Sequence, residues 1–283
     1  MLLKVKINPF FWLIVIGAIA TGQFIEIITL FGIVIIHELG HIFTAKSYGW
    51  KIIEIQLLPF GGMAKVEQPN DSRLEEFVVA IAGPLQNLMM ILVTMGLERL
   101  QMWSNEWATF FMEANLWIGL FNLLPISPLD GEKLMKVFFY LIFPFRKALT
   151  ISLFISFVLA ILLLFYSTGY WNHWKLNMNG IVLSIFFLYQ NWIEVKQVPF
   201  YFWQFLLRKA QASPKRNTSA VPLIVKEDTP VLHSLYLLKK ERYHLFYVLS
   251  NQGQILRILP EEKLLSIVFQ KKDLYQPIGK ITD

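Results

Sequence analysis

The sequence alternates between long apolar runs and short polar stretches over roughly its first two thirds. Six apolar runs approach or exceed the roughly 20 residues with which a helix crosses about 30 Å of hydrocarbon. These runs cover residues 8–22, 24–46, 76–97, 108–127, 148–168 and 177–195. The pattern predicts an α-helical polytopic membrane protein with about six transmembrane helices.

Residues 51–67, between the second and third runs, follow a different period. They are too few to cross a membrane as a helix and too apolar for an ordinary loop. Ile53, Ile55 and Leu57 alternate with polar residues, which is the period of a β-strand, and a proline and two glycines follow as a turn. We therefore expect a re-entrant β-hairpin with an open strand edge; the alternative is an amphipathic segment at the membrane surface.

Residues 121–143 interrupt the pattern a second time. Two prolines and a glycine break an apolar helix there, and Asp130 lies inside the break. Irregular backbone at membrane depth is tolerated only where it is enclosed by protein or lines a watery cavity. The break therefore marks a candidate site.

The composition changes after residue 197. Residues 208–220 are polar and typical of a linker, and the residues that follow predict strand, helix, strand, turn, strand and helix in that order. We expect three parts: a transmembrane domain over 1–197, a linker over 198–220 and a small soluble α/β domain over 221–283.

Positive charge is concentrated near the C-terminus. Residues 1–195 carry 12 Lys and Arg against 13 Asp and Glu, whereas residues 196–283 carry 14 against 7. Such a basic tail favours the anionic cytoplasmic face of a membrane, and its scattered charges argue against direct binding of nucleic acid. The Lys and Arg residues that flank the apolar runs fall mostly on the side of the N-terminus, so we expect both termini in the cytoplasm.

The second apolar run carries His37, Glu38 and His41 in the segment IIHELGHIF. Histidines four residues apart lie on one face of a helix, so both imidazoles can bind a single zinc ion. His-Glu-x-x-His is the pattern of zinc proteases, in which the glutamate is the general base. Ionisable groups inside a membrane helix need a partner, which favours a shared cation over a chance match or a hydrogen-bonded cluster.

A catalytic zinc ion needs a third protein ligand, and the chain has no cysteine to provide one. The remaining histidines are expected on the far side of the membrane or in the tail. Among the carboxylates, Asp130 is the best candidate because it lies in the proline-broken segment at membrane depth. Its alternative role is to cap the helix that follows Gly131.

The segments HELGH, AGPLQN and FNLLPISPLDG occur in this order, and together they resemble the site-2 protease family of intramembrane zinc metalloproteases. The resemblance covers most of the first 200 residues. It implies that His37, His41 and Asp130 bind zinc and that Glu38 activates water.

The candidate substrate-binding residues come from two places. Asn122 and Pro128 belong to the family's signature Asn-x-x-Pro-x-x-Pro-Leu-Asp-Gly. The resemblance implies that Asn122 helps to hold the substrate or to polarise the site, and Pro128 is a further candidate for substrate binding. The alternative for Asn122 is a side-chain hydrogen bond that breaks the helix. Ile53, Ile55 and Leu57 belong to the expected hairpin, whose strand edge would pair with an extended substrate.

The finer pattern is similar to a branch of this family that acts in spore formation. The hairpin segment LLPFGG, the six-span layout and a tail that resembles a single CBS module carry this likeness. It implies cleavage of a sigma-factor precursor at the mother-cell membrane around the forespore, inhibitory membrane proteins as partners, and an adenine nucleotide such as ATP at the tail. Because the tail buries little core of its own, we expect the nucleotide or a second copy, in a homo-oligomer, to stabilise it.

Three other functions stay open at this point. The protease could cleave an anti-sigma factor instead of a sigma-factor precursor. The protein could transport a metal ion, but a transporter needs polar residues leading outward from His37, and the sequence offers none. It could also be a catalytically silent scaffold, against which the complete set of His, Glu, His and Asp argues.

Overall fold

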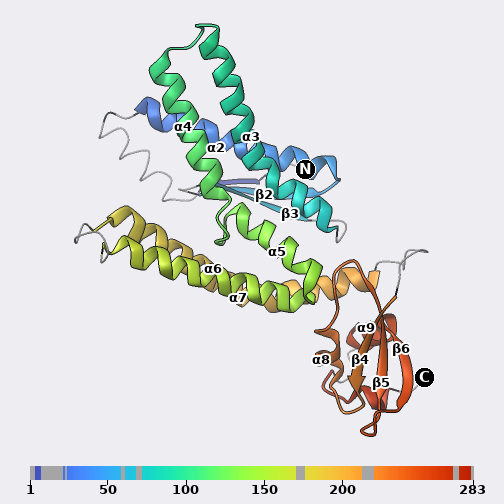
Figure 1. The fold of residues 1–283 in the computed structure, drawn as a ribbon. Coiled ribbons are helices and arrows are strands. Elements are labelled where there is room, and N and C mark those ends of the chain that lie inside the picture. The colour runs from blue at the N-terminus through green and yellow to red at the C-terminus, as the bar shows by residue number, and fades with distance from the viewer. Residues whose placement is uncertain are drawn as a thin grey trace. The chain divides into compact units, whose positions relative to one another are not determined.

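The computed structural model describes residues 4–7, 22, 24–58, 61–67, 72–169, 176–211, 220–269 and 274–281. The chain forms two compact units, Met1–Leu134 and Met135–Asp283, which we describe one at a time (Figure 1). Both units are mostly helical, and each contains a three-stranded sheet.

Among its described residues, the first unit contains three helices and the start of a fourth. They are α2 (Phe24–Ser47), α3 (Arg73–Arg99), α4 (Asn105–Asn122) and α5 (Asp130–Ile142). The first three pack against one another. The start of α3 is well defined, because the side chain of Ser72 accepts a hydrogen bond from the backbone N–H of Glu75. Acidic residues in its first turn and Arg99 in its last complement the helix dipole.

A glycine allows α2 and α3 to approach closely. A Cβ atom built on Gly40 would lie 2.5 Å from Cγ of Gln86 and 2.9 Å from the carbonyl oxygen of Ala82. These distances are too short for a real side chain, so the close packing of the two helices requires a glycine here. The packing of α2 on α3 thus explains the glycine inside HELGH.

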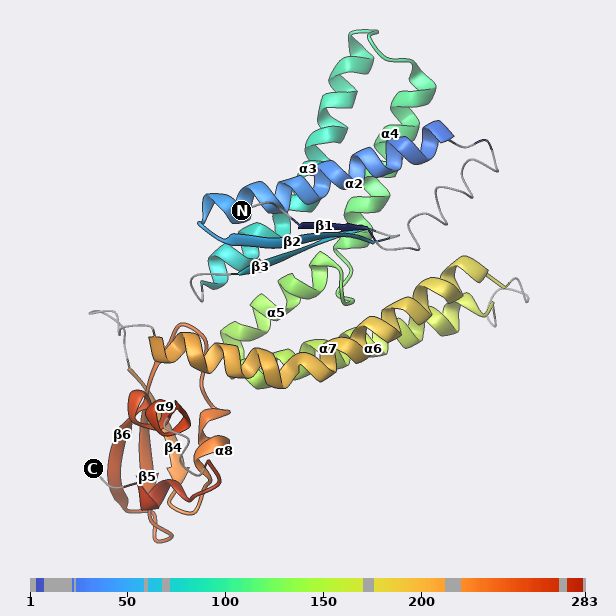
Figure 2. The same cartoon turned by 180° about the vertical axis from the view of Figure 1, so that it is seen from behind.

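The expected hairpin is present. Strand β2 (Lys51–Leu58) pairs antiparallel with β3 (Gly61–Glu67). A third strand was not expected: β1 (Lys4–Ile7) pairs parallel with β2, alongside residues 54–57. The order in the sheet is β1–β2–β3 (Figure 2). Because β2 is the central strand, the prediction that its edge is open over most of residues 53–57 is wrong.

Because β2 is paired on both sides, an extended substrate would have to pair with another strand of the sheet. Both neighbours of β2 use the backbone groups that an extended substrate would need. Among the described residues, the outer edges of the sheet belong to β1 and β3. The side chains of Ile53, Ile55 and Leu57 lie outside the described part of the structure, so their contact with substrate stays a prediction.

In the described part of the chain, three helices are long and apolar enough to cross a membrane: α2, α3 and α6 (Phe145–Ser167). Six spans stay a prediction. Apart from Gly22, the expected span at 8–22 lies outside the described residues. The expected span at 108–127 falls largely on α4, and that at 177–195 falls on the first part of α7 (Met178–Gln211).

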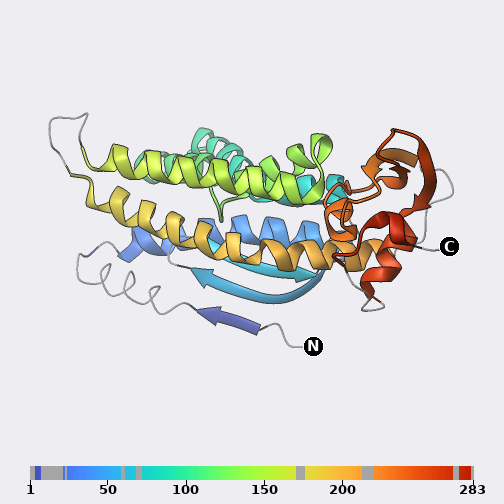
Figure 3. The ribbon, with the colours of Figure 1, turned by 90° about the horizontal axis from the view of Figure 1, so that it is seen from below.

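In the second unit, α6 and α7 lie side by side (Figures 1 and 3). Small side chains at a spacing of four residues, Ser152, Ser156 and Ala160, are fully buried on α6. On α7, Ser184 and Asn191 are also fully buried. Small and weakly polar residues of this kind let membrane helices pack closely.

Helix α7 extends beyond the apolar run that predicted it. It continues through Pro199 to Gln211, so residues 198–211 of the expected linker are helical, and 212–219 lie outside the described part. Phe205 and Leu206, which are 1% and 0% exposed, belong to the core of the C-terminal domain. This burial offsets the backbone hydrogen bond that a proline removes from a helix. The C-terminal domain therefore shares its core with α7.

The C-terminal domain has the predicted order of strands and helices. Its elements are β4 (Ala220–Lys226), α8 (Val231–Leu235), β5 (Tyr243–Leu249), β6 (Ile255–Pro260) and α9 (Glu261–Phe269). The central strand β5 pairs parallel with β4 and antiparallel with β6. Phe246 and Val248 alternate with less buried residues along β5 and share a core with Leu235 and Leu264 of the helices.

A buried ionic cluster joins the end of α7 to this domain. Nζ of Lys209 lies 3.0 Å from Oε1 of Glu261, and Nδ1–H of His244 donates to Oε2 of Glu261 at 2.8 Å. The backbone N–H of Lys239 donates to Nε2 of His244, which places the imidazole proton on Nδ1. Burial lowers the pKa of His244, and Lys209 and Lys239 add to this effect against the opposing influence of Glu261.

Candidate metal centre

His37 and His41 project from the face of α2 that packs on α3. They are 2% and 7% exposed and share this face with Ile33, Gly40 and Ala45. The spacing of four residues places the two imidazoles about one turn apart on the helix. Their Nε2 atoms lie 3.2 Å from each other. One ion can therefore contact both.

The proline-broken segment after α4 brings Asp130 to the two histidines. Asp130 is the first residue of α5 and is 4% exposed. Its Oδ2 lies 2.8 Å from Nε2 of His41 and 3.1 Å from Nε2 of His37. The potential ligand atoms of these three residues all lie within 4.8 Å of one another. The structure thus assembles the predicted ligand set.

Gly131 and Pro128, which belong to the same family signature as Asp130, shape the proline-broken segment between α4 and α5. A Cβ atom on Gly131 would overlap the carbonyl group of Leu123, so the start of α5 can lie against the end of α4 only with a glycine there. The Ser127–Pro128 peptide bond is cis. The role of Pro128 in substrate binding stays a prediction.

The hydrogen bonds of the two imidazoles place a proton on each Nδ1 atom. Nδ1 of His37 lies 2.5 Å from Oδ1 of Asn87, and Nδ1 of His41 lies 2.7 Å from the carbonyl oxygen of Val79. Both partners are acceptors, so each Nδ1 carries a proton, and a neutral imidazole then presents its lone pair at Nε2. Two such lone pairs and the carboxylate of Asp130 meet at one point, an arrangement that suits a cation. A set of two histidines and a carboxylate suits zinc.

Helix α3 leaves room for the ion at Gly83. A Cβ atom there would overlap Nε2 of His41 and lie 2.5 Å from Nε2 of His37. Glycine thus keeps open the volume directly in front of both nitrogen atoms, and the site fits a zinc ion held by His37, His41 and Asp130. A bound zinc ion supplies a Lewis acid that polarises a peptide carbonyl and lowers the pKa of water.

Lys133 and Glu38 are charged neighbours of these ligands. Nζ of Lys133 lies 2.8 Å from Oδ1 of Asp130, which leaves the other carboxylate oxygen turned to the histidines. Glu38 is partly exposed and close enough to His37 and Lys133 to interact with them electrostatically. A partly exposed carboxylate beside two such imidazoles can accept a proton as a general base.

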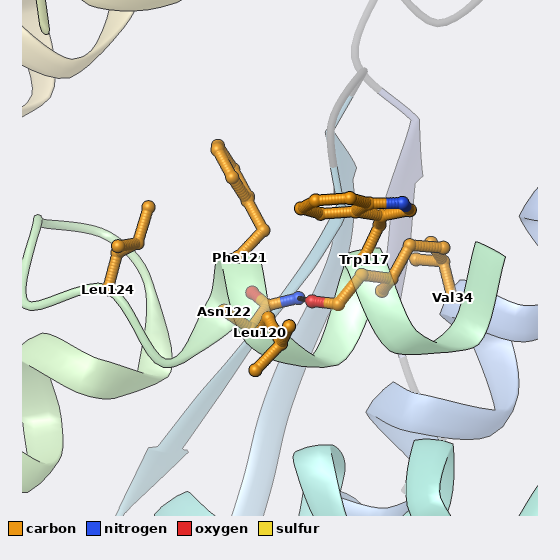
Figure 4. A pocket seen from close by; sticks show the side chains of 7 residues that line it. Val34, Trp117, Leu120, Phe121, Asn122 and Leu124 are labelled. Atoms are coloured by element: carbon orange, nitrogen blue, oxygen red, sulfur yellow. Dashed lines mark hydrogen bonds between the residues drawn. The ribbon is translucent and has the colours of Figure 1, made fainter. Parts of the chain in front are cut away.

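Asn122, at the end of α4, lines a cavity of about 410 Å³ (Figure 4). The other walls are apolar and include Trp117 and Phe121 of α4 and Val34 of α2. Nδ2 of Asn122 donates to the carbonyl oxygen of Ile118 at 2.9 Å, which is the helix-end hydrogen bond of its alternative role. Val34 precedes His37 by about one turn of α2, so the cavity lies near the helix face that carries the candidate metal ligands.

The fold and the site together define a membrane peptidase of the His-Glu-x-x-His type. The sequence pattern of peptidase family M50 matches residues 25–102. The chain belongs to this family, the site-2 proteases, and is an intramembrane zinc metalloprotease.

Individual relatives agree with this assignment. The chain is 33% identical to stage IV sporulation protein FB of Bacillus subtilis over 275 residues, which are 96% of this chain and 93% of that protein. A zinc metalloprotease of Methanocaldococcus jannaschii is 29% identical over 187 residues, 65% of this chain and 49% of that protein. The solved structure of the site-2 protease from Methanocaldococcus jannaschii has a TM-score of 0.55 and 27% identity, and the match covers 69% of this chain and 92% of that one.

The sequence predicted the three candidate ligands that the structure brings together, but it gave no role to the residues that contact them. Gly83 and Asn87 lie four residues apart in AGPLQN, on one face of α3. An asparagine within an otherwise apolar membrane run was the available signal for this face. Lys133 lies three residues after Asp130, the spacing of neighbouring side chains on a helix.

Proposed function

We propose that the chain cleaves the pro-sequence from a sporulation sigma factor, with zinc held by His37, His41 and Asp130 and with Glu38 as the general base. The likeness to stage IV sporulation protein FB over nearly the whole chain, C-terminal domain included, carries the choice of substrate. The convergence of three buried ligand atoms supports the choice of metal ligands.

Each residue has one task in this mechanism. His37 and His41 bind as neutral imidazoles, and Asp130 binds through one carboxylate oxygen while Lys133 holds the other. Glu38 takes a proton from water as the water attacks the scissile carbonyl carbon. It then gives this proton to the leaving amine as the peptide C–N bond breaks.

The substrate must be extended at the site, because a helix hides its carbonyl groups from attack. The outer edge of β3 is our candidate for pairing with it. This strand has seven residues and offers a longer edge than the four residues of β1. Backbone hydrogen bonds at a strand edge hold an extended peptide largely independently of its side chains. Asn122 and the adjacent cavity would then receive substrate groups.

The C-terminal domain has the strand–helix–strand–strand–helix order of a CBS-like module. We assign to it the recruitment of the sigma-factor precursor and the binding of an adenine nucleotide that adjusts the rate. Six spans with both termini in the cytoplasm would place this domain on the side where a soluble precursor arrives. Inhibitory membrane proteins of the sporulation type, and a second copy of the chain, are the expected partners.

The test is to co-express the full chain with a sporulation sigma-factor precursor in a host that lacks both. Wild-type protein should shorten the precursor, and the Glu38→Gln variant should leave it intact. Adding or withholding ATP with the purified proteins should change the rate. A zinc-loaded wild-type protein that leaves the precursor intact but cleaves an anti-sigma factor would refute the choice of substrate.

A further inference from the structure

Two buried asparagines connect the metal centre to α4. Asn87 on α3 and Asn115 on α4 are 1% and 0% exposed. Oδ1 of Asn87 accepts from Nδ1 of His37, and Nδ2 of Asn87 donates to Oδ1 of Asn115 at 3.1 Å. Nδ2 of Asn115 in turn donates to the carbonyl oxygen of Phe111 at 2.8 Å. A chain of hydrogen bonds thus runs from a metal-binding imidazole to the backbone of a neighbouring helix.

The donor and acceptor roles along this series of hydrogen bonds are fixed at its end on α4. The carbonyl group of Phe111 can only accept, so Asn115 must turn its NH₂ group toward it and its oxygen toward Asn87. Asn87 must then present its NH₂ group to Asn115 and its oxygen to His37. An Asn87 amide turned the other way would place its own N–H groups against the N–H of the imidazole. Asn115 therefore determines which end of Asn87 faces the metal centre.

Close packing keeps the three helices in this arrangement. A Cβ atom built on Gly119 of α4 would lie 3.3 Å from Cβ of Asn87, a distance that leaves little space for a side chain. Glycine at this position lets α4 approach α3 where the two amides meet. The side chains of Asn87 and Asn115 therefore meet between two helices whose backbones are already held close together.

We propose that Asn87 and Asn115 act as a positioning relay that holds His37 with its proton on Nδ1 and its Nε2 lone pair toward the zinc ion. This inference rests on the proposed function only in taking His37 as a zinc ligand. A carboxylate, a carbonyl group or water usually accepts the second N–H of a metal-binding histidine. A side-chain amide can accept this N–H without adding a charge to the membrane. Its oxygen and its NH₂ group differ, however, so it needs a partner that orients it.

The relay makes a quantitative prediction for zinc affinity. Loss of such an outer partner typically weakens metal binding by about 10–100-fold, and we expect this for Asn87→Leu. Asn115→Leu leaves Asn87 in place but free to turn over, so its loss of zinc affinity should be measurable but smaller than that of Asn87→Leu. The double variant should bind zinc no more weakly than Asn87→Leu alone, because Asn115 acts only through Asn87.

The experiment measures the zinc affinity of the purified full chain by competition with a chelator, with thermal unfolding as the report on folding. Asn87→Asp is the rescue variant: its carboxyl group accepts from His37 and, when protonated, donates to Asn115. Its affinity should stay within about threefold of wild type. Asn191→Leu is the matched control, because Asn191 is also 0% exposed and also donates to the carbonyl four residues back, but on α7. Its zinc affinity should be unchanged.

The His37→Ala variant separates failure of the relay from failure of the ligand assignment. If it abolishes tight zinc binding while Asn87→Leu binds as wild type does, the relay is refuted and His37 remains a ligand. If His37→Ala itself binds zinc normally, the ligand assignment fails. If the losses of Asn87→Leu and Asn115→Leu multiply in the double variant, Asn115 acts on the fold and the relay is refuted. Alanine variants carry the same comparison if a leucine variant does not fold.

Discussion

Gly83→Ala should strongly weaken zinc binding by adding a single methyl group. Its Cβ atom would overlap Nε2 of His41 and lie 2.5 Å from Nε2 of His37, in the volume that a zinc ion needs. A zinc–nitrogen bond is about 2.0–2.1 Å long, so the methyl group and the ion cannot both contact these atoms. Relief of the overlap requires the helices or the imidazoles to move, so the two Nε2 atoms can no longer meet Asp130 at one zinc ion. We expect zinc affinity to fall at least about 100-fold, which corresponds to about 2.7 kcal/mol.

The control for this substitution lies in the same helix. A Cβ atom on Gly96 of α3 has no neighbour within 4 Å, so Gly96→Ala should leave zinc binding unchanged. Alanine is also a better helix former than glycine by about 1 kcal/mol, so it should not destabilise α3. Both variants are compared with wild type by chelator competition and by zinc content after purification. A Gly83→Ala protein that binds zinc as tightly as Gly96→Ala would refute the position of the ion.

Three further predictions concern the third ligand, the sheet and the C-terminal domain. Asp130→Asn should lower zinc affinity and cleavage rate together by at least about tenfold, because a neutral amide is a poorer ligand. A variant with wild-type zinc affinity and cleavage rate would leave Asp130 as a helix cap, a role that Asn fills well. Met63→Pro and Ala64→Pro should have unequal effects, because adjacent residues of a strand direct their N–H groups to opposite sides. One variant should lose a hydrogen bond to β2. The other should lose a hydrogen bond to the substrate, so that it keeps zinc but cleaves more slowly. Normal cleavage in both would exclude substrate pairing at β3. The contribution of His244 to the free energy of unfolding of the C-terminal domain should be constant above about pH 6.5 and should fall below it, by up to about 1.4 kcal/mol per pH unit. The reason is that the lowered pKa of His244 keeps the folded imidazole neutral, while the imidazole of the unfolded chain binds a proton. Hydrogen exchange of the β5 amides in the full chain measures this, and a wild-type curve no steeper than that of His244→Gln would contradict it.

The convergence of the three candidate metal ligands was predictable because their chemistry and their spacing agree. His37 and His41 share a helix face by periodicity alone, and Asp130 is conspicuous because a carboxylate in a broken apolar run is costly. The C-terminal domain was predictable in its order of elements for a similar reason. Its strands alternate, and turn residues separate them.

The unexpected features all depend on contacts between residues far apart in the sequence. Strand β1 has the alternating sequence KVKI, but its pairing with β2 joins residues about 50 positions apart. Helix α7 passes Pro199 because Phe205 and Leu206 are buried in a core that forms only with the C-terminal domain. The link between Asn87 and His37 likewise requires α3 to lie against α2. Local propensity and periodicity contain no information about such pairings.

The proteolytic mechanism as a whole is tested most directly by one paired measurement on Glu38→Gln: zinc content per chain and cleavage of a co-expressed sigma-factor precursor. Because Glu38 acts as the base and not as a ligand, the variant should retain one zinc ion per chain. Its cleavage rate should fall by about 10²–10⁴-fold, the usual contribution of a general base. A variant that cleaves at the wild-type rate, or one that loses its zinc ion, would contradict the assignment of Glu38.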